Sequence, residues 1–249
     1  MDKFSDKIIG PESFSPTQLP LRNLEKPQGD TAHLWYLDFD QLSNPLNSEP
    51  DSKPHSIELS EFQHRATRRF YLRLLLGAYL DLPGKDIHIT RRIKGRPGLD
   101  SVQSKGKLDF SVARSGNGYL IGISSGAIIG VDLEFAARRA GKPAALARRY
   151  FSPEETAALS ELDGEELHRA FMHTWACKEA IVKANGLGIA NQLYRFTVDV
   201  NPDNPPSVLS MQDDDPSAWK LIIAEPAEGA IAAIAVRQQS VQLVGFSLS

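Results

Sequence analysis

The sequence has few features that would cross-link the chain, anchor it or charge it as a whole. It has one cysteine, Cys177, so no disulfide can form within the 249 residues. No apolar run approaches the roughly 20 residues of a membrane span, and the early prolines argue against a signal peptide. A net charge of −3 creates no global field suited to nucleic acid or a membrane surface. We therefore expect a cytoplasmic monomer with neither nucleic acid nor membrane as a partner.

Charge is nearly balanced overall but is unevenly distributed along the chain. Residues 65–114 contain twelve Lys and Arg against four Asp, an excess of eight positive charges in a slightly acidic protein. Such an excess suits a polyanionic ligand, and it is equally compatible with a solvated basic surface. Charge alone does not decide between these two interpretations.

The first half of the chain predicts one long helix among several strands. Residues 1–30 contain Pro, Ser and Gly with little periodicity, which indicates an extended lead-in. The aromatic stretch 33–39 is β-prone, and residues 60–80 place apolar side chains at helical spacing. Residues 108–125 are typical of two strands joined by a tight turn.

The second half follows a similar plan. Residues 127–135 form a predicted strand, and residues 137–186 are predicted to be mostly helical. Four short apolar stretches then suggest closing strands. The sequence therefore predicts an α+β protein with two similar subdomains, residues 31–126 and 127–249, that meet near Gly126.

The stretch "GVDLE" at residues 130–134 carries two closely spaced carboxylates. Side chains alternate along a strand, so Asp132 and Glu134 share one face while Val131 and Leu133 point into a core. Like charges on one face repel, which is tolerable at a solvated edge and useful where a hard cation lies between them. Both interpretations stay open from these residues alone.

The stretch "FMHTWACKEAIVKANGLG" predicts a helix whose apolar stripe is flanked by charges. Glu179 and Lys183 lie one turn apart and can form an ordinary surface pair. That interpretation does not explain their closeness to Phe171 and Trp175. The alternative is that this helix edge lines a cleft, where Glu179 joins the two strand carboxylates around Mg²⁺ and lysines meet phosphate oxygens.

Together these motifs resemble a known family. "GVDLE" followed by "W-x-x-K-E-A-x-x-K-A-x-G-x-G" is similar to the signature of the 4′-phosphopantetheinyl transferases of the Sfp type. The matching residues of the second motif are Trp175, Lys178, Glu179, Lys183, Gly186 and Gly188. "GRPGL" and "LDFSVARSGNGYLIGIS" resemble the nucleotide loop and a strand of the family's first half, and the likeness covers roughly residues 33–198.

The resemblance implies a fold, a reaction and two partners. The fold would be a pseudodimer of two α+β subdomains with the active site between them. The first subdomain would bind the nucleotide end of coenzyme A, and the second would carry the metal and the catalytic residues. The enzyme would transfer 4′-phosphopantetheine from coenzyme A to a serine of an apo acyl or peptidyl carrier protein, in the presence of Mg²⁺.

The resemblance also implies roles for individual residues, carried over by matching position. The implied metal ligands are Asp132, Glu134 and Glu179, with Glu179 also serving as the base for the carrier serine. Lys183 would contact the pyrophosphate, assisted by Lys178. The implied contacts to the nucleotide end of coenzyme A are Arg69, Arg96, Pro97 and Arg114.

The sequence departs from the family pattern in the first subdomain. The family usually has Ser-His where this chain has Ala113-Arg114, and Asn where it has Ser111. A guanidinium binds phosphate through two donors and keeps its charge, so Arg114 is expected to replace the His at the 3′-phosphate. Arg96 stands where the family has Lys, which is a milder change.

Three rival functions remain at this point. A Mg²⁺-dependent phosphohydrolase with the same carboxylates would release phosphate without a carrier protein. A nucleic-acid-binding module using the basic residues 65–114 would bind DNA or RNA with strong salt dependence. A degenerate transferase would bind coenzyme A without transferring its arm.

Overall fold

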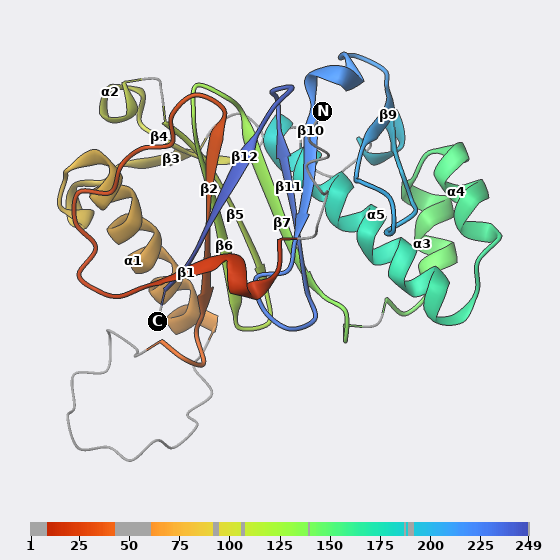
Figure 1. Ribbon diagram of the computed structural model, residues 1–249, viewed down its shortest axis with the longest axis horizontal. Coiled ribbons are helices and arrows are strands. Elements are labelled where there is room, and N and C mark those ends of the chain that lie inside the picture. Colours follow the sequence, from red (N-terminus) through yellow and green to blue (C-terminus); the bar gives the residue numbers. More distant parts are fainter. Residues whose placement is uncertain are drawn as a thin grey trace, which may run out of the picture.

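Two β-sheets packed face to face form the centre of the protein, and a helix covers the outer face of each (Figure 1). The computed structural model describes residues 9–42, 61–91, 95–105, 108–138, 140–186, 188 and 192–248. The first sheet has the strand order β1-β12-β2-β6-β5, and helix α1 lies against it. The second sheet has the order β10-β11-β7, and helix α5 lies against it.

The elements follow one another in the order that the sequence predicts, with some additions. The strands are β1 (Phe14–Thr17), β2 (Thr31–Asp38), β3 (Ile89–Arg91), β4 (Pro97–Leu99), β5 (Leu108–Ser115), β6 (Gly118–Ser125), β7 (Ile129–Phe135), β8 (Phe196–Val198), β9 (Val208–Met211), β10 (Lys220–Ala224), β11 (Ala230–Val236) and β12 (Gln242–Leu248). The helices are α1 (Glu61–Leu80), α2 (Ser101–Ser104), α3 (Pro143–Tyr150), α4 (Pro153–Ser160) and α5 (Gly164–Asn185). Strands β1, β4 and β9 are the additions, since each is too short for a clear alternating pattern.

The core divides into layers because each strand alternates its side chains between two faces. Odd-numbered residues of β7, such as Val131 and Leu133, pack against Leu34 and Leu120 of the first sheet. Even-numbered residues of β7 face α5 instead, and these include Asp132 and Glu134. The predicted split of "GVDLE" into a core face and an acidic face is confirmed.

The two halves repeat one topology, as expected from their similar sequence plan. Each half contains a strand, a long helix, a two-stranded hairpin and two more strands: β2-α1-β3/β4-β5-β6 and β7-α5-β8/β9-β10-β11. The sheet orders also match, since β6 lies between β2 and β5 as β11 lies between β7 and β10. The α+β class with two similar subdomains is therefore confirmed.

The last strand does not stay with the half in which the sequence places it. Strand β12 belongs to residues 127–249 by sequence. It nevertheless lies in the first sheet, between β1 and β2 and parallel to both. The lead-in predicted as extended supplies β1, and Ile9 also bridges to Ala224 of β10. The predicted subdomain 127–249 is therefore wrong in this respect. The exposed edge of β2 needs a partner for its backbone groups, and β12 provides it.

Local sequence signals account for the ends of the helices that shape the site. Ser152 and Glu155 form a capping box at the start of α4, with Pro153 in its first turn. Gly186 ends α5 at φ 66°, and its N–H donates to the carbonyl of Val182. Among the described helices, none is long and apolar enough to span a membrane.

Candidate active site

Helix α5 lies unusually close to strand β7 because Gly130 has no side chain. A Cβ atom at Gly130 would lie 2.0 Å from the carbonyl oxygen of Ala180 and 2.4 Å from the amide nitrogen of Ala184. Helix backbone therefore fills the space that a side chain would need. Glu179 directly precedes Ala180, and Lys183 directly precedes Ala184. This contact therefore brings both charged residues to the acidic face of β7.

The closest charged contact of the site joins these two elements. Lys183 Nζ donates to Asp132 Oδ1 at 2.6 Å, and the lysine side chain keeps 31% of its surface exposed. The other carboxylate oxygen, Asp132 Oδ2, is buried and has no hydrogen-bond partner. Leaving a buried carboxylate oxygen unsatisfied is costly, so this atom fits a further cation that approaches it.

The second strand carboxylate is held from the solvent side. Glu134 Oε2 accepts from Arg138 at 3.0 Å and from the Ser115 hydroxyl at 3.4 Å. Arg138 is largely exposed, at 68% of its side chain, so this ion pair lies at the rim of the site. Glu179 forms no hydrogen bond with any residue in the described part of the chain, although it is almost fully buried.

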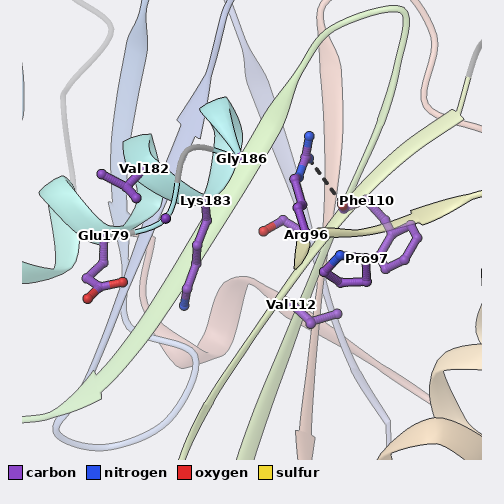
Figure 2. A pocket seen from close by; sticks show the side chains of 10 residues that line it. Arg96, Pro97, Phe110, Val112, Glu179, Val182, Lys183 and Gly186 are labelled. Atoms are coloured by element: carbon purple, nitrogen blue, oxygen red, sulfur yellow. Dashed lines mark hydrogen bonds between the residues drawn. The ribbon is translucent and has the colours of Figure 1, made fainter. Parts of the chain in front are cut away.

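Glu179 lies in the wall between two neighbouring pockets. The first pocket, about 220 Å³, is bounded by Arg96 and Pro97 on one side and by Glu179 and Lys183 on the other. Figure 2 shows Glu179 and Lys183 extending from α5 opposite Arg96 and Pro97. The second pocket, about 440 Å³, is lined by all three carboxylates together with Arg138 and apolar residues that include Trp175, Phe171 and Met172. Of the described residues that line these pockets, Glu179 alone is common to both.

Burial raises the pKa of all three carboxyl groups, and repulsion by neighbouring carboxylates adds to the rise for Glu134 and Glu179. Loss of hydration is the largest cause in each case. It raises the pKa of Glu179 to about 7, with Asp132 and Glu134 adding to the rise and Lys183 opposing it. A carboxyl group with a pKa near neutrality is suited to accept a proton during catalysis.

The three carboxylates fit a divalent cation through their chemistry rather than through a finished cage. They share one pocket, Asp132 and Glu134 raise the pKa of Glu179, and Asp132 Oδ2 has no hydrogen-bond partner. Among the described residues, however, no three His, Cys, Asp or Glu side chains are gathered closely enough to hold a metal ion as they stand. Asp132 and Glu134 are instead paired with Lys183 and Arg138. The ligand set therefore stays a prediction.

Lys178 does not belong to this site. Its ammonium group is fully buried and donates to both carboxylate oxygens of Glu155, at 2.7 Å each. It lies on the side of α5 that α4 and β8 cover, and it lines neither pocket. The expectation that Lys178 contacts phosphate is wrong, because burial separates its charge from any ligand in either pocket.

The residues predicted for the nucleotide end of coenzyme A are distributed along the first half. Pro97 and Arg96 line the first pocket. One nitrogen of Arg96, Nη2, donates to Asp109 Oδ2 and to the carbonyl of Ile129 at 2.6 Å each. It also donates to the carbonyl of Phe110 at 3.2 Å. Arg96 thus links the two halves, whatever further contact it makes with a ligand.

Arg69 and Arg114 are exposed and lie outside the lining of either pocket. Arg114 follows Val112 on the same face of β5, and Val112 lines the first pocket. Arg68 lies near Tyr119, the strand partner of Arg114, since its charge opposes the burial that raises the pKa of the Tyr119 hydroxyl. Arg69 stays a prediction for the nucleotide end of coenzyme A, and Arg114 stays a prediction for its 3′-phosphate.

Sequence reasoning missed the residues that hold the two halves together. Strand β5 contacts β7 through side chains, since Asp109 accepts from the Ile129 N–H and Ser111 accepts from the Val131 N–H. Neither residue carries a local signal of this role. Gly130 does carry one, because a glycine inside a strand often marks a close approach of another backbone.

Comparison with known proteins identifies the family of this chain. The model of the 4′-phosphopantetheinyl transferase superfamily matches residues 128–235. The 4′-phosphopantetheinyl transferase HetI of Nostoc sp. is 30% identical over 215 residues, which span 83% of this chain and 88% of that protein. The chain therefore belongs to the 4′-phosphopantetheinyl transferase superfamily.

A second relative supports the resemblance to the Sfp type. The 4′-phosphopantetheinyl transferase Sfp of Bacillus subtilis is 27% identical over 201 residues, covering 74% of this chain and 85% of that protein. A solved holo-(acyl-carrier-protein) synthase from Bacillus anthracis, in complex with CoA, is 21% identical with a TM-score of 0.37. It covers 44% of this chain and 95% of that structure.

Proposed function

We propose that this enzyme transfers 4′-phosphopantetheine from coenzyme A to the serine of an apo acyl or peptidyl carrier protein. The observation that carries the proposal is the position of Glu179. Its carboxyl group lies in the wall common to two pockets, beside Lys183 and within the influence of Asp132 and Glu134. A group in that position can reach a donor in one pocket and an acceptor in the other.

The first pocket suits the pyrophosphate of coenzyme A. Lys183 faces it with a partly exposed ammonium group while remaining bonded to Asp132. Arg114 extends the same face of β5 toward the region where we place the 3′-phosphate. The excess of positive charge over residues 65–114 then balances a polyanionic donor, which favours binding over a merely solvated basic surface.

Glu179 acts as the base in the proposed reaction. It accepts the proton of the carrier serine as the serine oxygen attacks the β-phosphorus of coenzyme A. The bond from that phosphorus to the bridging oxygen breaks, and adenosine 3′,5′-bisphosphate leaves. Lys183 offsets the negative charge that builds on the departing phosphate.

Asp132, Glu134 and Glu179 are the residues that would hold Mg²⁺. Asp132 offers the unpartnered Oδ2 atom, and Glu134 and Glu179 border the same pocket. When bound, the ion would supply charge neutralisation at the pyrophosphate. Lys183 and Arg138 neutralise two of these carboxylates in the structure described here.

One mixture tests the proposal against its rivals. The protein is incubated with Mg²⁺, coenzyme A and several apo-carrier proteins, and the carriers are weighed by mass spectrometry. We expect a gain equal to one phosphopantetheine group on at least one carrier, and a far slower gain with Glu179→Gln. Release of inorganic phosphate without any carrier, or no mass gain on any carrier, would contradict the proposal.

We extend the proposal to the setting of the reaction. We infer a monomer that acts in the cytoplasm, where coenzyme A and carrier proteins are available and where a free thiol such as Cys177 persists. The proposed reaction gives no role to nucleic acid or to a membrane. Size-exclusion chromatography with light scattering tests the monomer, and a dimeric mass would contradict it.

A further inference from the structure

The buried ammonium group of Lys178 is the meeting point of three elements. Its Nζ atom donates to both oxygens of Glu155 on α4 and to the carbonyl oxygen of Phe196 on β8, at 2.7, 2.7 and 2.5 Å. It also lies 4.2 Å from the ring centre of Phe196 and 5.5 Å from that of Phe151. All three ammonium donors are therefore used inside the protein.

Glu155 is equally committed. Its Oε2 atom accepts from the Ser152 N–H at 2.9 Å, which completes the capping box of α4. Its Oε1 atom accepts from the Val198 N–H at 2.7 Å. The ion pair thus ties the start of α4, the strand β8 and the middle of α5 to one point that has no exposed surface.

Stability alone is a weak reason to retain such a pair. Removing two charges from water is costly, and apolar side chains of similar volume often stabilise a protein as well or better. What the pair offers over apolar packing is direction, because each bond fixes the place of a particular atom. In this protein the atom so fixed belongs to the residue directly before Glu179.

The geometry of a helix converts that fixed point into a fixed carboxylate. A group about 6 Å from the helix axis moves by about 1 Å when the helix rotates by roughly 10°. Gly130 sets how closely α5 approaches β7, at the Ala180 carbonyl and at the backbone and Cβ of Ala184. Lys178 lies on the covered side of α5, where its bonds oppose that rotation.

We propose that the Lys178–Glu155 ion pair is a positioning device, which sets the rotation of α5 and thereby places the Glu179 carboxylate between the two pockets. The inference rests on the proposed function for its kinetic consequence. The proposal assigns a role to Lys178, which no ligand in either pocket can touch.

The test separates positioning from stability. Lys178→Met leaves Glu155 buried and unpaired, whereas the double variant Lys178→Met with Glu155→Gln leaves no buried charge. We expect the double variant to regain most of the urea resistance that Lys178→Met loses. Its kcat should stay about tenfold or more below that of the native enzyme, while its KM for coenzyme A changes less than about twofold.

A matched control removes buried volume from α4 without touching either charge. Leu159→Ala serves this purpose, since Leu159 is buried in the cluster that also contains Phe151. We expect it to lose stability and keep its kcat. A native kcat in the double variant, or an equal loss of kcat in Leu159→Ala, would overturn the inference.

A second measurement needs no activity. A crystal structure of the double variant supports the inference if α5 has rotated enough to displace the Glu179 carboxylate by about 1 Å. An unmoved Glu179 overturns it. This result stands even if the native enzyme modifies no carrier protein, so failure of the proposed function and failure of the positioning role are distinguishable.

Discussion

Replacing Gly130 with alanine tests whether the close contact of α5 with β7 creates the site. The backbone of Gly130 is not left-handed, so alanine is allowed there by its own conformation. The added Cβ atom would lie 2.0 Å from the Ala180 carbonyl oxygen, whereas comfortable contact needs roughly 3.5 Å. We expect α5 to retreat by about 1 Å or more.

The consequence for the site follows from the shortest charged contact. A retreat of about 1 Å stretches the 2.6 Å bond between Lys183 Nζ and Asp132 Oδ1 beyond hydrogen-bonding distance. Overpacking of this kind costs about 1–3 kcal/mol of unfolding free energy. A misplacement of about 1 Å can lower the rate about 100-fold. Gly130→Ala should therefore lose far more activity than stability.

The assay compares two alanine substitutions made in the same way. Urea unfolding gives the stability, and the rate of carrier modification gives the activity. Gly118→Ala is the control, because its added Cβ meets the side chains of Leu133 and Tyr36 at 3.0 and 3.2 Å rather than helix backbone. We expect it to keep its activity. If Gly130→Ala modifies the carrier at the native rate, the seating of α5 on Gly130 does not position the site.

Four further predictions concern charge. Glu179→Gln should slow transfer about 100-fold or more. Because the pKa of Glu179 rises from 4.5 to about 7 on folding, the folded protein binds the extra proton, so stability falls as pH increases across that window. With a chelator present, Glu179→Gln should therefore be more stable than the native protein above pH 7, by up to about 3 kcal/mol of unfolding free energy. Near pH 4 the two proteins should be equally stable. Equal unfolding curves at pH 8 would contradict the raised pKa of Glu179. Arg114→Ala should raise the KM for coenzyme A about tenfold and leave that for dephospho-coenzyme A unchanged, whereas equal effects on both donors would remove Arg114 from the 3′-phosphate. Burial lowers the pKa of His33 below 6.5, so stability should fall as pH decreases below that value, and His33→Phe should flatten the slope measured by urea unfolding; an unchanged slope would show that His33 does not cause it.

Short-range patterns were sufficient for much of the molecule. Alternation along "GVDLE" placed Asp132 and Glu134 on one face, because a strand reverses its side chains at every residue. Helical spacing placed Glu179 and Lys183 on neighbouring parts of one helix. These features depend on residues that are close together in the sequence, so they can be predicted from the sequence directly.

Contacts between distant segments were decided by the tertiary structure. Lys178 and Lys183 lie on the same helix with the same charge, yet one is buried against Glu155 and the other faces a pocket beside Asp132. Their spacing does not reveal which side of α5 the helix α4 will cover. The return of β12 to the first sheet is likewise invisible to local periodicity. The sequence by itself determined the family, the repeated plan and the acidic face. Packing between segments decided which charged side chains line the two pockets, because burial depends on neighbours that lie far away along the chain.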